Sequence, residues 1–276
     1  MNLGRRRFRD RVMAALVVLG TLVVLVPLFF ILFYVFAEGL GALNWAFFTQ
    51  GPRPPGEAGG GMLPAIVGTF VVDLIALVLA AVLGLAAGIL LAEYPEHPLN
   101  PPLRLVADVM AGLPAILMGL VAFVLVVKPL GHFSGLSGSV ALALIMIPII
   151  VRATEGVLKL IPWELREAGL ALGLPRWRVV LSLVLPAARG GILTGLMLAL
   201  ARGAGEAAPL LFTAFGNPYL TTNPLEPMDT LPLKIFVYAV SPYEDWHRQA
   251  WGAALLLALL IMAASYLARR YAGGRR

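Results

Sequence analysis

EAGLALG at residues 167–173, followed after nine residues by LVLP at 183–186, is the most informative pattern in this sequence. A helix is expected to begin just before it, because Pro162 suits a first helical position that needs no backbone N–H. Apolar positions then recur on one helical face, at Leu165, Ala168 or Gly169, and Leu172. Gly173 and Pro175 supply a glycine-then-proline stop. The pattern predicts a short amphipathic helix with a sharp end, then a second short helix that runs into Pro186.

The composition is that of a helical membrane protein. Hydrophobic residues make up 60% of the 276 residues and charged residues 13%, whereas soluble domains have roughly 45–50% and about 25%. Long uncharged runs therefore predict an all-α, polytopic membrane protein. The absence of cysteine excludes disulfides and thiolate-bound metals, and the three histidines show no metal-ligand spacing. Basic residues at the ends of the spans explain the net charge of +6, so we expect no nucleic-acid partner.

Six membrane spans are predicted, at residues 12–36, 63–92, 105–127, 139–156, 190–212 and 250–268. The first follows a basic segment, residues 1–11, and is longer than the roughly 7–15 apolar residues of a signal peptide, so we expect it to be retained. Pro27 and Pro114 predict kinks in the first and third spans. Residues 12–276 are thus expected to form a single transmembrane domain, with the 167–186 pattern inside a loop at 157–189.

The distribution of positive charge predicts the orientation. Sixteen of the 21 Lys and Arg residues fall on the side that carries the amino terminus, and four fall on the other side. By the positive-inside rule, both termini and the 157–189 loop are expected in the cytosol. An amphipathic helix in a cytosolic loop is available to a soluble partner.

The fifth predicted span contains two charged residues, Arg202 and Glu206. Counted from Arg189, Arg202 lies roughly 20 Å into a hydrocarbon core of about 30 Å, where insertion scales assign an arginine about 2.5–3.5 kcal/mol. Glu206 is one helical turn further and within pairing reach. Two interpretations stay open: an ion pair that locks two helices together, or a polar lining of a transport path in which Arg202 offers donors to an oxyanion. Asp73, in the second span, is expected to be a helix–helix hydrogen-bonding group.

The 167–186 pattern resembles the EAA loop in permease subunits of bacterial ABC importers. The resemblance rests on Glu167, Ala168, Gly173, Leu183, Leu185 and Pro186. Gly169 departs from the usual second alanine, and glycine costs about 1 kcal/mol in a helix interior. Four further stretches resemble the A-type permease of phosphate importers: MLPAIVGT (62–69), LPAI with GL (113–120), PIIVRATE (148–155), and TG with ARGAGEAAPLLFT (194–213).

The resemblance implies a MetI-like permease fold in the cytoplasmic (inner) membrane and a path for inorganic phosphate. It also implies a second, related permease subunit in a heterodimer, two ATP-binding subunits and an extracytoplasmic phosphate-binding protein. Coupling to the ATPase would fall to Glu167, Ala168, Gly173, Leu185 and Pro186. Arg202 and Glu206 would line the path. The chain itself would need no cofactor, because ATP and Mg²⁺ are used by the partner ATPase.

The alternatives are another oxyanion, such as molybdate or sulfate, and a different class of protein. An ion-gradient-driven secondary transporter would use Glu206 or Asp73 as a proton carrier, but the inverted repeats typical of such folds are not evident. No Gly-x-x-x-x-Gly-Lys-[Ser/Thr], His-Glu-x-x-His or Gly-x-Ser-x-Gly motif occurs. We therefore expect no enzymatic activity in this chain and no catalytic residues.

Overall fold

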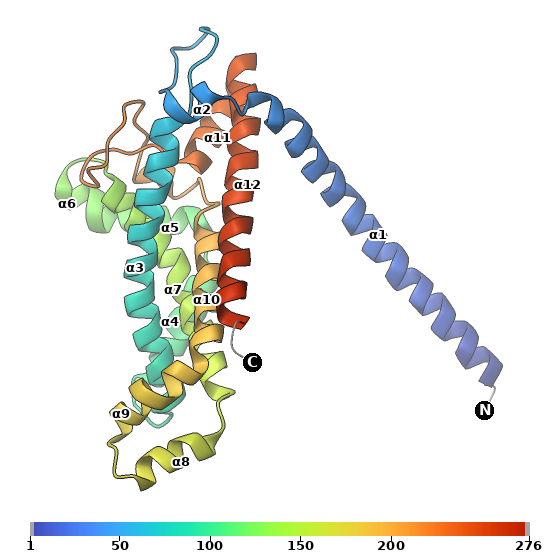
Figure 1. Ribbon diagram of the computed structural model, residues 1–276, viewed down its shortest axis with the longest axis vertical. Helices are drawn as coiled ribbons and strands as arrows, with labels where there is room; N and C mark the ends of the chain where they lie inside the picture. Colours follow the sequence, from blue (N-terminus) through green and yellow to red (C-terminus); the bar gives the residue numbers. More distant parts are fainter. Residues whose placement is uncertain (1–2, 274–276) are drawn as a thin grey trace.

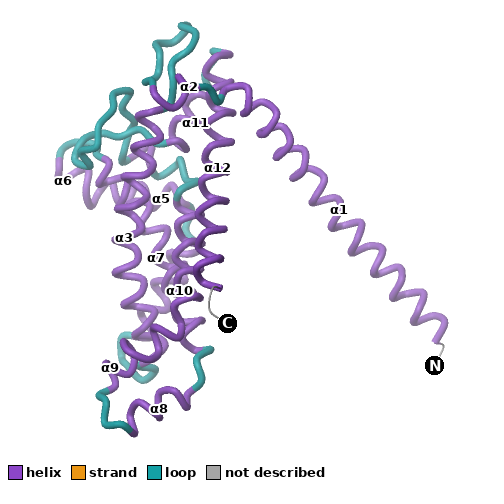
Figure 2. Tube along the Cα trace, viewed as in Figure 1, coloured by secondary structure: helices purple, strands orange, loops and turns teal. Residues whose placement is uncertain are grey.

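The computed structural model describes residues 3–273, which form an elongated helical bundle without a β-strand (Figures 1 and 2). The long helices are α1 (Leu3–Ala42), α3 (Leu63–Glu93), α7 (Gly135–Lys159), α10 (Leu185–Gly203) and α12 (Glu244–Gly273). The shorter helices are α2 (Trp45–Thr49), α4 (Asn100–Gly112), α5 (Ala115–Ala122), α6 (Lys128–Leu130), α8 (Trp163–Ala171), α9 (Arg176–Val179) and α11 (Leu231–Ala239). Within the described range, five helical segments are long and apolar enough to cross a membrane, or six if α4 and α5 form one bent span. The expected all-α, multi-span architecture is confirmed.

The bundle has two distinct ends, termed here the α8 end and the α2 end (Figure 1). Helices α8 and α9 lie at the first end, and α2 and α11 lie at the second. The ends of the described chain, at residues 3 and 273, both lie away from the α2 end in Figure 1. Parts of the predicted basic segment 1–11 and of the carboxyl-terminal tail lie outside the described residues.

Helix α7 occupies the centre of the bundle and corresponds to the fourth predicted span, 139–156. It is longer than that span, because a capping box at Ser134 and Ser137 begins the helix before residue 139. Helix α3 packs closely along it: a Cβ built on Gly84 would lie 2.8 Å from Ile150, and one built on Gly88 would lie 2.6 Å from Thr154. Only glycine permits this backbone approach, so α3 and α7 form a rigid pair.

The third predicted span, 105–127, is broken rather than kinked at Pro114. Helix α4 ends at Gly112, α5 begins at Ala115, and the two axes differ by 113°. Pro114 lacks a backbone N–H and disfavours the helical conformation at Leu113, whose ψ is 140°. Because Leu113 stands between a glycine and a proline, the chain does not continue as one helix through this junction.

The fifth predicted span, 190–212, has different bounds in the structure. A continuous helical segment runs from Arg176 to Gly203 and includes α9, a π-helical turn (Val180–Val184) and α10. The second short helix therefore does not stop at Pro186. The wider π turn before this proline relieves the clash that its ring would make with the preceding turn. The same order, a π turn (Phe123–Val127) and then a proline at its second following residue, occurs before α6.

Helix α1 diverges from the rest of the bundle (Figure 1). Pro27 lies inside α1 without interrupting it. None of its most apolar 18-residue window is buried within the chain. The last turns of α1 contact α12, and a Cβ built on Gly39 would lie 2.7 Å from Leu255. Most of the α1 surface is therefore free to contact lipid or another subunit.

Candidate functional site

The EAGLALG stretch forms α8 and the turn that ends it. Pro162 occupies the N-cap position, one residue before the first helical position expected for it. At the other end, Gly173 has a φ of +78°, and its N–H donates to the carbonyl of Leu170. The N–H of Leu174 donates to the carbonyl of Gly169, which completes a Schellman ending before Pro175. The predicted glycine stop is confirmed.

Helix α8 has one attached face and one exposed face. Its buried residues are Arg166 and Gly169. Glu167, Ala168 and Gly173 are exposed, while Leu185 is half-buried and Pro186 is exposed where the chain re-enters the bundle. The glycine at 169 is explained by packing, because a Cβ there would lie 2.8 Å from Leu183 and 2.9 Å from Val179. These contacts leave the opposite face of α8 available to a partner.

Arg166 joins α8 to the end of α3, an attachment that the sequence analysis missed. Its Nε donates to Oε2 of Glu93 at 2.9 Å and its Nη2 to Oε1 at 2.6 Å. The two side chains are only 9% and 2% exposed. The sequence carried one signal for this buried face of α8. Arg166 and Gly169 are three residues apart, which places both on the same face of a helix.

A second ionic cluster joins α4 to α7 near the α8 end. Glu155, 7% exposed, accepts from Arg104 at 2.8 Å, Arg152 at 3.0 Å and Lys159 at 2.7 Å. Arg152 also contacts Asp108 of α4. Helix α4, the first half of the broken span, is thus fixed to α7 by three cations around one buried carboxylate. Among residues 3–273 no group of three His, Cys, Asp or Glu side chains is placed to bind a metal ion.

Arg202 and Glu206 form the expected ion pair, but they do not share a helix. Arg202 lies in the last turn of α10, and Glu206 lies in the turn beyond it. The helix ends where its neighbours come closest: Gly203 lies against Met146 of α7, and a Cβ on Gly119 of α5 would lie 2.6 Å from Pro209. The pair therefore sits at the end of α10, just before the segment that contacts α5 through Pro209.

The depth of Arg202 follows from its neighbours. Ala201 and Ala204 line one cavity together with Leu257 and Leu260, which lie near the middle of the 30-residue α12. Arg202 is thus at mid-length of the bundle, as expected from its place in the sequence. Its side chain is 58% exposed and that of Glu206 is 15% exposed. A charged group exposed at this depth faces either lipid, which is costly, or a surface of another subunit.

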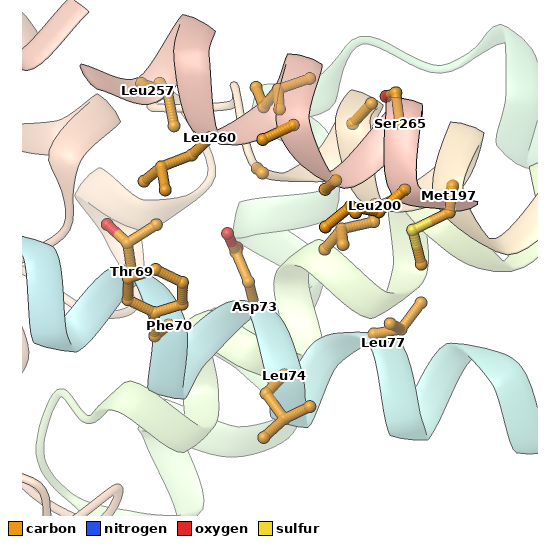
Figure 3. Close-up of a pocket in the computed structure, with 16 residues that line it drawn as sticks. Thr69, Phe70, Asp73, Leu74, Leu77, Met197, Leu200, Leu257, Leu260 and Ser265 are labelled. Carbon is orange, nitrogen blue, oxygen red and sulfur yellow. The ribbon is translucent and has the colours of Figure 1, made fainter. Parts of the chain in front are cut away.

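Asp73 lies apart from this pair. Figure 3 shows its carboxyl pointing into a cavity of about 360 Å³ between α3, α10 and α12. The other lining residues labelled there are mostly apolar, with Thr69 and Ser265 as the polar exceptions. No hydrogen bond or ion pair joins Asp73 to another described residue, so the structure does not support its expected role between helices.

The segment after α10 folds back over the α2 end. The carbonyl of Thr213 accepts from Ser134 N–H at 3.1 Å and from the Ser137 hydroxyl at 2.9 Å. Further on, the buried Asp229 contacts Lys234 of α11 at 2.5 Å. Burial raises the pKa of Asp229, and the Lys234 ammonium opposes this rise in part. These contacts attach the segment after α10 to the amino-terminal end of α7 and to α11.

Comparison with known proteins places this geometry in a family. The family of binding-protein-dependent transport system inner membrane components matches residues 84–273. A phosphate transport system permease protein PstA of Yersinia pestis is 42% identical over 265 residues, which cover 96% of this chain and 90% of the relative. The PstA of Haemophilus influenzae is 39% identical, with 96% and 94% covered. A probable PstA of Methanocaldococcus jannaschii is 36% identical, with 97% and 94% covered.

Two solved structures have the same fold at low sequence identity. A chain of the inward-facing MetNI methionine ABC transporter aligns with a TM-score of 0.66 at 19% identity, over 78% of this chain and 96% of that one. A chain of a bacterial alginate ABC transporter aligns with a TM-score of 0.64 at 12% identity, over 97% and 96%. The expected MetI-like permease fold is confirmed.

Proposed function

The chain belongs to the family of binding-protein-dependent transport system inner membrane components, and we propose that it forms one half of an ATP-driven path for inorganic phosphate across the cytoplasmic membrane. The observation that carries this proposal is the Arg202–Glu206 pair, exposed at mid-length of the bundle. A second permease subunit would cover this surface and remove it from lipid. The phosphate named in the relatives supports the choice of substrate.

The pair has the chemistry that a phosphate path needs. Guanidinium offers several N–H donors in a planar fork that matches two oxygens of one phosphate. Glu206 balances the positive charge when the path is empty. A path that bound its anion too tightly would not release it, and the neighbouring carboxylate limits that affinity.

The partners follow from the family, whose members work within ABC importers. We propose a heterodimer with a second, homologous permease, two ATP-binding subunits and an extracytoplasmic phosphate-binding protein. The unburied surface of α1 supports contact with another subunit. ATP and Mg²⁺ are used by the ATPase, and this chain contributes transport rather than an enzymatic step.

Helix α8 is the proposed contact with the ATPase. Its exposed face includes Glu167 and Ala168, and Gly173 turns the chain back toward the bundle. Closure of two ATPase subunits on ATP would move α8 and change which end of the path is open. Leu185 and Pro186 are the first residues of α10, the helix that connects this loop to Arg202.

The direct test is ATP hydrolysis by the assembled complex in liposomes with different oxyanions. We expect binding protein and phosphate to stimulate hydrolysis and uptake, and sulfate and molybdate to do neither. A complex prepared without this chain is the control. Stimulation by sulfate or molybdate alone would reassign the substrate, and uptake driven by an ion gradient without ATP would contradict the importer class.

Topology is tested by labelling single cysteines, which the native sequence lacks. We propose that the α8 end is cytosolic, supported by the sixteen basic residues assigned to that side. Tyr219→Cys, at a site 79% exposed near the α2 end, is expected to react with an impermeant reagent in intact cells. Leu172→Cys, at a site 82% exposed next to α8, is expected to react only after permeabilisation. The reverse pattern would invert the proposed topology.

A further inference from the structure

The guanidinium of Arg166 connects three helices at one point. Besides the two bonds to Glu93, its Nη2 donates to the carbonyl of Leu158 at 3.0 Å, and its Nη1 to Ile161 at 2.8 Å and Pro162 at 3.4 Å. Leu158 lies in the last turn of α7, and Glu93 is the last residue of α3. The positive charge thus lies at the carboxyl ends of two helices, where their dipoles favour it.

A second contact ties the loop to the same helix end. Arg176, the first residue of α9, donates to the backbone carbonyl of Glu93, and its guanidinium lies 4.8 Å from the ring centroid of Tyr94. Residues on both sides of Gly173 are therefore attached to the end of α3. By contrast, the Gly169 contacts hold α8 to α9 and to the π turn after it, within the same loop.

The burial of the pair determines how it responds to force. Glu93 and Arg166 are nearly excluded from solvent, and their bidentate geometry fixes the orientation as well as the distance of the two groups. Separating them leaves two buried charges without their counter-charges, which is strongly unfavourable. An exposed ion pair would instead exchange with water at little cost. The pair therefore resists both separation and rotation.

We infer that Glu93 and Arg166 are the positioning residues that transmit movement of α8 to the α3–α7 pair. The inference rests on the proposed function, in which an ATPase moves α8. Because α3 and α7 pack through Gly84 and Gly88, a displacement of their shared end moves both helices together. The link acts through α8 and contacts neither phosphate nor nucleotide.

The first test compares phosphate transported per ATP hydrolysed in the reconstituted complex. Glu93→Gln and Arg166→Gln are expected to lower this ratio about tenfold, within the roughly 2- to 30-fold range of coupling residues. ATP hydrolysis and association with the ATPase are expected to persist. Arg166→Lys keeps the charge but loses the fork, so its ratio should fall less. Glu96→Gln removes an exposed carboxylate three residues from Glu93 and should leave the ratio unchanged.

A double variant, Glu93→Gln with Arg166→Gln, separates coupling from folding. It removes both charges, so neither is left buried alone, and it should assemble even where a single variant does not. Its ratio is expected to stay low, because two neutral side chains do not replace the bidentate contact. A double variant with the wild-type ratio overturns the inference.

A second test measures the link without transport. Spin labels on Glu96→Cys and Glu164→Cys report the distance between the end of α3 and the start of α8. In the otherwise unchanged complex this distance should be the same with and without ATP, and it should change on ATP binding in the double variant. If the distance between the labels changes on ATP binding while Glu93 and Arg166 are both present, the inference is overturned. Hydrolysis that does not depend on phosphate would contradict only the proposed substrate.

Discussion

Arg202→Ala is expected to abolish phosphate uptake while the complex still assembles. The variant loses the donor fork at mid-length of the bundle and leaves Glu206 without its partner. Each hydrogen bond to a charged group contributes roughly 1.5–3 kcal/mol, so loss of two lowers uptake by about 100-fold or more. Uptake of radioactive phosphate, measured together with copurification of the ATPase, checks this result. Arg53→Ala is a matched control, since it removes an exposed arginine that also pairs with a glutamate four residues on.

A double variant separates the two interpretations of the pair. In Arg202→Leu with Glu206→Leu, both charges are gone, and such replacements of ion pairs are often neutral or stabilising. If the pair lines the phosphate path, the complex assembles but does not transport. If the pair only locks the turn after α10 to the helix, transport recovers. An assembled and active double variant would therefore remove these residues from the path.

Gly173→Asp is expected to dissociate or uncouple the ATPase. A Cβ at this position meets no atom of the chain within 4 Å, so within this subunit the only penalty is the positive φ of +78°. That penalty is about 1–2 kcal/mol and is smaller for Asp or Asn than for other side chains. A larger effect must come from the surface that α8 contacts.

Gly173→Asn is the control, because it has the same shape and the same tolerance of positive φ without the charge. We expect it to retain more ATPase association than Gly173→Asp in a pull-down from membranes. The subunit itself should be inserted at normal levels in both variants. Wild-type association and transport in Gly173→Asp would exclude this turn from the contact.

Local signals made α8 predictable, and tertiary contacts account for what sequence reasoning missed. The glycine stop at Gly173 is encoded within a few residues, and the structure reproduces it. The end of α10 at Gly203 depends on the approach of Met146 and on the contact of Pro209 with Gly119, which no local pattern reveals. The predicted span therefore continued to residue 212.

The Glu93–Arg166 contact was missed for a related reason. The two residues are 73 positions apart. Glu93 directly follows the second predicted span and Arg166 lies within the predicted loop at 157–189, and charged residues at both places have an ordinary explanation in the orientation of the chain. Burial of both side chains distinguishes the contact from a solvated pair, and burial is a property of the folded chain. In the same way, Pro114 indicated a bend, but its size of 113° depends on how α5 packs against α7 and the segment after α10.

The central place of α7 has a consequence for biogenesis. In its most apolar window 61% of residues are buried by the rest of the chain, and its buried groups include Ser139, Thr154 and Glu155. Ser139 and Glu155 have hydrogen-bond partners within α7 itself, but most of the apolar window of this helix faces other helices of the chain rather than lipid. Helix α3, made earlier, already presents the groove at Gly84 and Gly88 that receives it. Stable insertion of the middle of the chain therefore awaits its neighbours, whereas α1 can enter the bilayer alone.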